Sequence, residues 1–369
     1  MTLAAAFCLG QFHFAVADLL LTSDRIDEEG PSDLTLPAMG RVDCLPKEHR
    51  TVRGLTQKLC VISDDFVAAF AGDLRKGRIG IRGLHKMAQQ GPVTPASLQE
   101  FARRGGALLN GVALVGMVVE SDTRAFNFEI NGERFLCDYV GEVVAAGSGV
   151  YLLRLIFDMG RIGPSGFEQL PPGLRALSKV ASLCGLLFQD EHATGLPVLE
   201  ARTGGAYEIA CFREGRFVKQ EVTFVLWHIN VTDGRVDVKE PMLFVKTKYS
   251  GHLLLCNVAR WTCQPDGSMP IWNLGVYAIP PAFPHAEEEV TETPASIGFA
   301  SEIVQHTVLV LKDETHVRVF SVVETGGSAL NPRMSAAQFE FSHDLGFLQL
   351  LQRHVEARMD EPWEDLRQM

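Results

Sequence analysis

Residues 58–73 read KLCVISDDFVAAFAGD and hold the pattern around which the chain is organised. Apolar residues alternate after Lys58, a turn follows at Asp64-Asp65, and a second apolar run ends at Gly72. Two β-branched or aromatic runs around a short acidic turn predict a β-hairpin. A glycine at its end lets the backbone approach a ligand closely, and an amide there can bind an oxyanion. Considered alone, the stretch is better explained as an ordinary buried hairpin.

The flanking sequence predicts further strands and helices. Residues 8–26 indicate a strand, a tight turn near Ala17-Asp18 and a second strand, LLLTSD, that ends at Asp24. Thr94 followed by Pro95 is a typical helix start. The other predicted elements are a surface loop over 27–54, a helical segment over 73–91, strands over 111–120, 124–130, 133–139 and 195–201, and helices over 150–159 and 173–189.

The pattern changes after residue 213. Short apolar runs bounded by turns predict strands, residues 285–294 form an acidic, proline-ended linker, and residues 343–358 predict a terminal helix. We therefore divide the chain into residues 1–212 and a β-rich extension, residues 213–369. The sequence does not identify the role of the extension, which is a possible site for a partner.

Composition excludes several classes of function. The chain has 369 residues, of which 46% are hydrophobic and 21% charged, as in globular proteins. A net charge of −11 argues against binding of nucleic-acid phosphates. The eight cysteines form no CxxC pair and have no zinc-like spacing to histidine, so we expect no metal, no cofactor and a reducing cytoplasm. The apolar start MTLAAAF lacks the basic residues of a signal peptide, and no apolar run reaches the ~20 residues of a membrane span.

The order and spacing of five segments resemble a known family. They are residues 14–26, 58–73, 110–135, 143–153 and the stretch QDEHATGLP that begins at Gln189. Together they resemble the β-type subunits of the proteasome and their bacterial relatives of the HslV and Anbu type, which are N-terminal-nucleophile hydrolases. The resemblance covers about residues 8–212. It implies an α+β fold, an αββα sandwich of two sheets with helices outside, followed here by the β-rich extension.

The resemblance assigns roles to individual residues. Asp24 matches the family aspartate, Lys58 the catalytic lysine and Gly72 the oxyanion glycine, since the interval from Lys58 to Gly72 is the family's own. Ser148, in the sequence GSG, matches the supporting serine. Each also has a structural explanation: Asp24 as a partner of Arg25, Lys58 as a solvated strand end, and Ser148 as a helix cap.

A second pair of matches is less regular. Glu191 and Thr194 fall where the family has an aspartate and a serine three residues apart. The glutamate departs from the family pattern, and Asp190 could serve in its place.

The nucleophile has three interpretations. Counting back from Asp24 by the family spacing leads to Cys8, a sound nucleophile if residues 1–7 are removed, although Phe7 stands where self-processing members have glycine. Thr2 would instead be freed by removal of Met1 and requires a longer first hairpin. In the third interpretation Cys8 is a core cysteine and the protein is inactive. If Thr2 is the nucleophile, its hydroxyl should lie beside Lys58 and Cys8 should point into the sandwich.

Three functions follow from these possibilities. The first is a peptidase or amidohydrolase acting on peptide or protein substrates in a homo-oligomer assembled through apolar helical faces at 94–110 and 150–159. The second is a noncatalytic proteasome-like scaffold that binds a partner through its extension. The third is a small-molecule amidase. The lysine at position 58 argues against an inactive subunit, which needs none.

Overall fold

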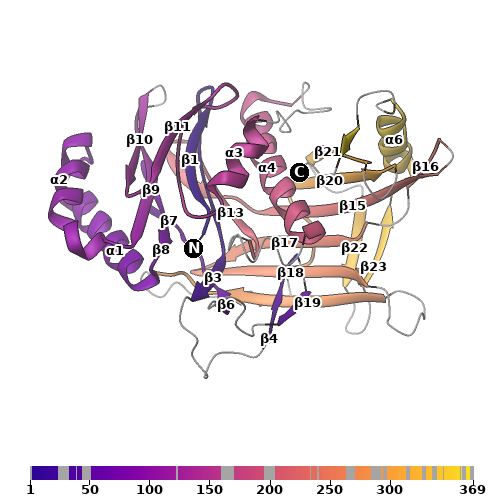
Figure 1. Cartoon of the computed structure of the whole chain (residues 1–369), viewed down its shortest axis with the longest axis horizontal. Coiled ribbons are helices and arrows are strands. Elements are labelled where there is room, and N and C mark those ends of the chain that lie inside the picture. Colours follow the sequence, from indigo (N-terminus) through magenta and orange to yellow (C-terminus); the bar gives the residue numbers. More distant parts are fainter. Residues whose placement is uncertain are drawn as a thin grey trace.

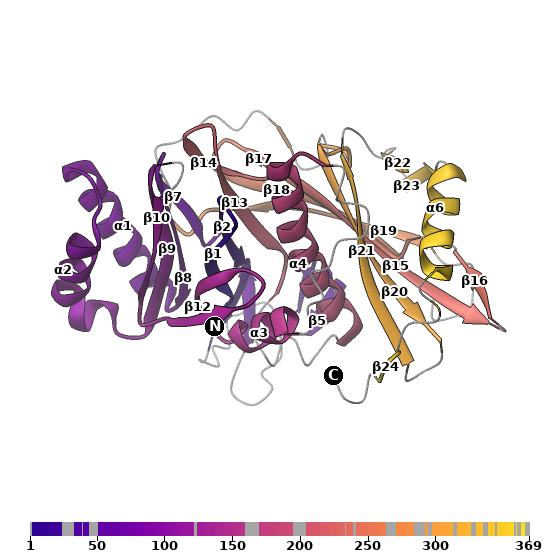
Figure 2. The same ribbon diagram turned by 90° about the horizontal axis from the view of Figure 1, so that it is seen from above.

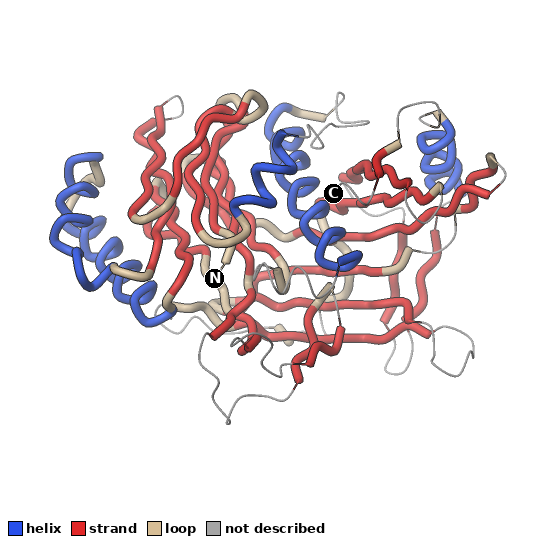
Figure 3. The backbone as a smooth tube through the Cα atoms, viewed as in Figure 1, coloured by secondary structure: helices blue, strands red, loops and turns tan. Residues whose placement is uncertain are grey.

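The computed structural model places most of the chain. It describes residues 2–23, 33–38, 40–43, 51–121, 124–158, 170–194, 204–232, 234–238, 241–262, 271–283, 292–293, 297–312, 316–325, 330–334, 339–343, 345–357, 359 and 363–365. Strands account for 50% of the described residues and helices for 28%. Figure 1 shows the elements in chain order, and Figure 3 separates the helices from the strands by colour.

The elements stack in layers, which Figure 2 shows edge-on. Helices α1 (Leu74–Gln90) and α2 (Pro95–Gly105) cover a four-stranded sheet, which packs against a six-stranded sheet. Helices α3 (Val150–Asp158) and α4 (Pro172–Thr194) follow, and an eight-stranded sheet packs on α4. Helix α6 (Leu345–Glu356) lies on the far face of that last sheet.

The first two sheets are antiparallel and contain the strands that surround Lys58. The four-stranded sheet has the order β10-β9-β8-β7, and the six-stranded sheet β11-β12-β1-β2-β13-β14. The four-stranded sheet consists of β7 (Leu59–Ser63), β8 (Phe66–Gly72), β9 (Val112–Ser121) and β10 (Arg124–Ile130). The six-stranded sheet consists of β1 (Ala4–Leu9), β2 (Phe12–Asp18), β11 (Glu133–Cys137), β12 (Gly141–Ala146), β13 (Tyr207–Arg213) and β14 (Arg216–Lys219).

The third sheet lies entirely in the C-terminal region. Its order is β19-β18-β17-β15-β20-β21-β24, with β16 paired to β15, and only the β15–β20 pairing is parallel. Its strands are β15 (Val222–Thr232), β16 (Arg235–Asp237), β17 (Leu243–Ser250), β18 (Leu253–Thr262), β19 (Ile271–Ile279), β20 (Ile303–Leu311), β21 (His316–Thr325) and β24 (Glu364–Asp365). Small two-stranded pairs join β3 (Leu20–Ser23) to β6 (Thr51–Leu55), β4 (Asp33–Leu36) to β5 (Gly40–Asp43), and β22 (Leu330–Met334) to β23 (Phe339–His343).

Helix α4 joins the two halves of the chain in one hydrophobic core. Its Phe188 packs edge-on against Tyr207 of β13, with ring centroids 5.2 Å apart, and against Phe224 of β15 at 4.9 Å. All three side chains are at most 2% exposed. Because one helix contributes to both contacts, the eight-stranded sheet and the six-stranded sheet share a continuous apolar interior.

Several predicted elements are confirmed. The stretch 58–73 is the hairpin β7–β8. Thr94 caps α2, where its hydroxyl accepts a hydrogen bond from the Ser97 amide while the Ser97 side chain accepts one from the Thr94 amide. Strands dominate the C-terminal region, and its last helix is α6. The predicted strand over 195–201 lies outside the described residues.

The predicted αββα sandwich is wrong as a description of this fold. The largest sheet is the eight-stranded one, and it covers α4, which is therefore an inner layer and not an outer one. The sequence predicted strands in this region but not that they would pack on the helices. The sheet packs on helices at both faces because β15 is apolar on both. Its residues Phe224 and Leu226 face α4, while Val225 and Trp227 face α6.

The first hairpin is also different from the prediction. Strands β1 and β2 turn at Gly10-Gln11, and not near Ala17-Asp18, which instead ends β2. Gly10 has a positive φ of 62°, which a tight turn requires and glycine adopts without strain. The region predicted as a loop over 27–54 contains β4 and β5 and the start of β6.

Candidate functional site

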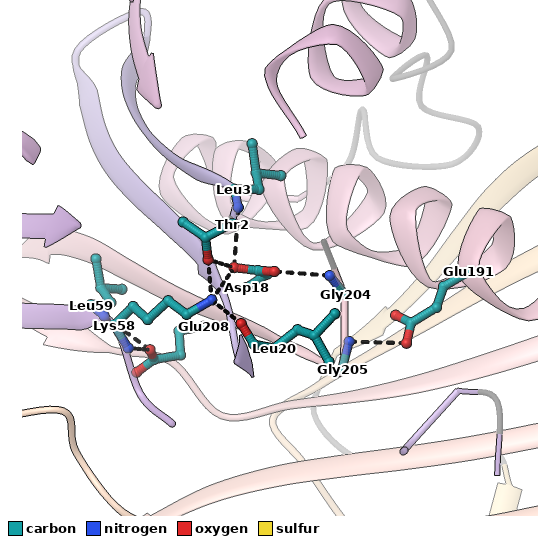
Figure 4. A network of polar contacts seen from close by, with 10 residues as sticks. All are labelled: Thr2, Leu3, Asp18, Leu20, Lys58, Leu59, Glu191, Gly204, Gly205 and Glu208. Atoms are coloured by element: carbon teal, nitrogen blue, oxygen red, sulfur yellow. Dashed lines mark hydrogen bonds and ion pairs between the residues drawn. The ribbon is translucent and has the colours of Figure 1, made fainter. Parts of the chain in front are cut away.

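Three polar side chains from separate strand ends meet in the interior. Thr2 precedes β1, Asp18 ends β2, and Lys58 precedes β7. The Lys58 ammonium donates a hydrogen bond to Thr2 Oγ1 and lies 2.8 Å from Asp18 Oδ1, and the Thr2 hydroxyl donates to the same carboxylate oxygen. Figure 4 shows the three converging on one point.

This cluster is almost completely enclosed. Thr2 is 1% exposed, Asp18 0% and Lys58 2%. Burial lowers the pKa of Lys58 because it disfavours the ammonium, and the Asp18 charge and hydrogen bond oppose that shift. The pKa of Lys58 is therefore lower than that of a solvated lysine, so the neutral amine forms at a lower pH. Its nitrogen contacts the Thr2 hydroxyl.

Backbone groups hold the carboxylate and the ammonium in place. Asp18 Oδ1 accepts a hydrogen bond from the Leu3 amide at 3.1 Å, and Oδ2 accepts one from the Gly204 amide at 2.9 Å. The Lys58 ammonium also donates to the Leu20 carbonyl. These bonds satisfy the groups that burial separates from water, as a buried ion pair requires.

The GSG turn packs directly on the backbone of Thr2. Gly147 has φ of 98°, and a Cβ there would lie 1.6 Å from the Thr2 carbonyl oxygen, so only glycine fits. The Gly149 amide donates to that same oxygen at 3.4 Å. Ser148 Oγ is buried and has no hydrogen-bond partner among the described residues. The GSG turn therefore lies at the site, while the supporting role of Ser148 stays a prediction.

Cys8 lies elsewhere. It is six residues beyond Thr2 along an extended strand, or about 20 Å at 3.3 Å per residue. Its sulfur lies 3.2 Å from His13 Nδ1, and the side chain packs against the core between the four-stranded and six-stranded sheets. Burial, with a smaller effect of Glu142, raises the pKa of the Cys8 thiol to about 11, which disfavours the reactive thiolate. If Cys8 were the nucleophile, its sulfur should lie beside Lys58, and this expectation is wrong. The Thr2 hydroxyl lies there instead, as expected for Thr2 as the nucleophile.

The aspartate of the site is Asp18, which the sequence analysis assigned to a turn. Asp24 lies outside the described residues. The turn was predicted near Ala17-Asp18 and the family aspartate at Asp24, from which the family spacing leads back to Cys8. The same interval of 16 residues leads back from Asp18 to Thr2. Gly10-Gln11 between two apolar runs was the signal that locates the turn correctly and makes Asp18 the end of β2.

Gly72 ends β8 as predicted, with φ of 106°. An added Cβ would lie 2.4 Å from the Gly111 carbonyl oxygen, so the close approach that glycine permits here is to the start of β9. This packing accounts for the glycine without a ligand. A role of the Gly72 amide as an oxyanion donor stays a prediction.

Glu191 adjoins the site through two glycines. It lies on α4, and its Oε1 accepts a hydrogen bond from the Gly205 amide at 2.9 Å, one residue from the Gly204 amide that binds Asp18. Gly204 leaves no room for a side chain, since a Cβ there would lie 2.7 Å from the Glu191 carboxyl carbon. Thr194 is the last residue of α4, and its side chain lies outside the described residues.

Glu191 is buried in an environment that favours the protonated acid. Burial raises its pKa from 4.5 to about 8, the Asp18 and Asp190 charges act in the same direction, and the Gly205 hydrogen bond opposes them. Its Oε2 has no hydrogen-bond partner among the described residues. At neutral pH the Glu191 carboxyl is therefore largely protonated.

The described part of the chain shows no group of three or more His, Cys, Asp or Glu residues able to hold a metal ion. None of its helices is both long enough and apolar enough to cross a bilayer.

No protein-family model matches the sequence, and no curated protein is significantly similar to it.

The buried carboxyl of Glu191 predicts a specific dependence of stability on pH. The folded state holds this proton up to about pH 8, whereas the unfolded chain releases it near pH 4.5. Stability from this group is therefore complete below pH 4.5 and is lost as the pH rises toward 8, by up to about 1.4 kcal/mol per pH unit.

Glu191→Gln, which keeps an oxygen for the Gly205 amide, should remove that slope. Urea unfolding at several pH values between 5 and 8 measures it. The control is Glu214→Gln, which removes a carboxylate from an exposed turn. Equal slopes for the wild type and Glu191→Gln would contradict the assignment.

Proposed function

We propose that this protein is an N-terminal-nucleophile hydrolase that cleaves peptide or amide bonds with the Thr2 hydroxyl. One observation carries the proposal: the Thr2 hydroxyl lies in a buried cluster with both Lys58 and Asp18. Removal of Met1 would add the α-amino group of Thr2 to that cluster. The resemblance of residues 58–73 and of the GSG turn to proteasome β-type subunits supports the same chemistry.

The reaction has two halves. In the first, Thr2 Oγ attacks the carbonyl carbon of the substrate amide, and its proton passes to a neutral amine, either Lys58 Nζ or the α-amino group. The tetrahedral intermediate collapses, the C–N bond breaks, and the leaving amine takes up that proton. In the second half, water attacks the carbonyl carbon of the resulting ester and the same base accepts its proton. The C–O bond to Thr2 breaks, the base returns the proton to Thr2 Oγ1, and the carboxylic acid is released.

The neighbours of Lys58 suit that role. Burial lowers its pKa, so a greater fraction is neutral and able to accept a proton. Asp18 keeps the nitrogen beside Thr2 Oγ1 and stabilises the ammonium that forms when the proton arrives. One carboxylate thus orients the base and compensates its charge.

A scaffold role explains the cluster less well. Replacing a buried ion pair with apolar residues of similar size is often neutral or stabilising by about 1–4 kcal/mol. A purely structural strand end would gain little from Lys58 and Asp18 at 2% and 0% exposure. Their presence beside a hydroxyl favours catalysis over a noncatalytic scaffold.

We further propose a reducing cytoplasmic location, since the cysteines of the described residues are free thiols.

We also propose a homo-oligomer. Leu136 on the edge strand β11 is 84% exposed, and Tyr151 on α3 is 76% exposed, so a contact between copies at these residues would remove apolar surface from water.

Light scattering at micromolar concentration tests the assembly. We expect a mass that is a multiple of the protomer's 40.6 kDa, and Leu136→Glu should reduce it because a charge on the contact surface disfavours association. A wild-type mass of one protomer would contradict the proposal.

The nucleophile is tested by acylation with an aliphatic β-lactone, whose ring opens when an activated hydroxyl attacks it. In chains that have lost Met1, we expect one adduct, located by mass spectrometry on the peptide that begins with Thr2. Thr2→Ala should abolish this adduct, and Thr2→Ser should retain it because the hydroxyl remains. Labelling that persists in Thr2→Ala, or that occurs on Cys8, would contradict the assignment.

Lys58→Met should lower the rate of that acylation by about 10²–10⁴-fold, the usual contribution of a positioned base. The matched control is Lys246→Met, because Lys246 is also a buried lysine, 1% exposed, and pairs with Glu221 in the eight-stranded sheet. Circular dichroism verifies that both variants fold. Equal rates in the two variants would show that Lys58 is not part of the chemistry.

A further inference from the structure

A second carboxylate binds the main chain at Lys58. Glu208 lies on β13 and is 1% exposed. Its Oε2 accepts hydrogen bonds from the amide of Lys58 at 2.7 Å and from the amide of Leu59 at 3.0 Å. Figure 4 shows this carboxylate below the lysine stem, on the other side from Asp18. The two carboxylates thus fix Lys58 at both ends, Asp18 at the ammonium and Glu208 at the backbone.

The strand pairing explains why Glu208 reaches Lys58. Tyr207 is the partner of Asp18 in the β2–β13 pairing, and its side chain packs against α4. Because successive side chains of a strand point to opposite faces, Glu208 points the other way, toward the four-stranded sheet and the start of β7. The register that places Asp18 in the site therefore also places Glu208 behind it.

The other oxygen of Glu208 is bound from the C-terminal half of the chain. Oε1 accepts a hydrogen bond from the Tyr249 hydroxyl at 3.1 Å and lies 2.8 Å from Lys219 Nζ. Tyr249 belongs to β17 of the eight-stranded sheet, and Lys219 Nζ lies 4.9 Å from the centre of its ring. Lys219 also donates to Gln57 Oε1 at 3.0 Å.

The same sheet binds the residue that precedes Lys58. The Gln57 side-chain amide donates to the carbonyls of His252 and Ile279, both at 2.8 Å. Its backbone amide donates to the Pro280 carbonyl at 3.0 Å, and its carbonyl accepts from the Ala282 amide at 2.9 Å. Gln57 is 3% exposed, so each of these bonds satisfies a group separated from water.

We infer that Glu208 is a positioning residue for Lys58 and that the eight-stranded sheet, through Tyr249 and Gln57, is a required part of the catalytic unit. The inference rests on the proposed function, because it assigns the C-terminal region a role in holding the base. It explains why residues 56 and 57 are bound to a sheet that begins more than 160 positions later. The Glu208 charge also raises the pKa of Lys58, against the effect of burial.

Two variants separate positioning from folding. Glu208→Gln removes the charge, and Tyr249→Phe removes only the hydroxyl that the sheet contributes. The control is Tyr277→Phe, the same change on β19 of the same sheet. Each full-length protein is examined by amide hydrogen exchange of the peptide that contains Lys58 and Leu59, and by β-lactone acylation of Thr2 between pH 5 and 9.

We expect exchange at Lys58 and Leu59 to accelerate at least about tenfold in Glu208→Gln, since bonds to a charged acceptor are lost. The pH at which acylation reaches half its maximum should move lower, because removing an anion lowers the pKa of a nearby amine. Tyr249→Phe should reduce the maximal acylation rate while the midpoint stays within about 0.3 pH units. Tyr277→Phe should change neither.

Three results would overturn the inference. The first is unchanged exchange in Glu208→Gln, and the second is faster exchange with an unchanged acylation midpoint, which would limit Glu208 to a structural role. The third is a Tyr249→Phe variant that behaves as Tyr277→Phe does, which would show that the Tyr249 hydroxyl of the sheet is not needed at the site. If Thr2 of the wild-type protein is not acylated, the proposed function itself is wrong. That result comes from the wild type alone and is therefore distinct from the three results above.

Discussion

The buried ion pair between Lys58 and Asp18, at 2.8 Å, is the interaction on which the rest of the structure depends. Removing two charges from water costs several kcal/mol for each, and their attraction offsets this only when the remaining donors and acceptors are also bound. The chain meets that condition with backbone groups of Leu3, Leu20 and Gly204. Four separate segments must therefore end at the same place, which restricts the register of every strand around them.

That restriction extends into the C-terminal half. The pairing of β13 with β2 places the Gly204 amide against Asp18, and in the same strand it turns Glu208 toward Lys58. Glu208 is itself a buried charge and needs partners, which Lys219 and Tyr249 supply. Each buried charge thus requires hydrogen-bond partners from the next layer. The eight-stranded sheet completes the core around α4 and also binds the polar groups of Glu208 and Gln57 behind the lysine.

Local patterns were informative wherever short-range physics decides the structure. The acidic turn between apolar runs predicted the β7–β8 hairpin, and the Thr94-Pro95 cap predicted the start of α2, because turn and cap chemistry involve residues close in sequence. The first hairpin was wrong because its turn was placed near Ala17-Asp18 and not at the glycine at position 10. The family aspartate was therefore assigned to Asp24, from which the spacing leads back to Cys8, whereas the same interval of 16 residues leads back from Asp18 to Thr2.

The sequence by itself determined that a lysine at position 58 begins a buried hairpin and that the C-terminal region is built of strands. Only the tertiary structure decided that Thr2 and Asp18 meet this lysine, that Cys8 is enclosed away from it, and that the eight-stranded sheet covers α4. The physical reason is range: alternation and capping are set by neighbours in the chain, whereas the partner of a buried charge is set by strand register and layer packing across intervals of 40 to 150 residues.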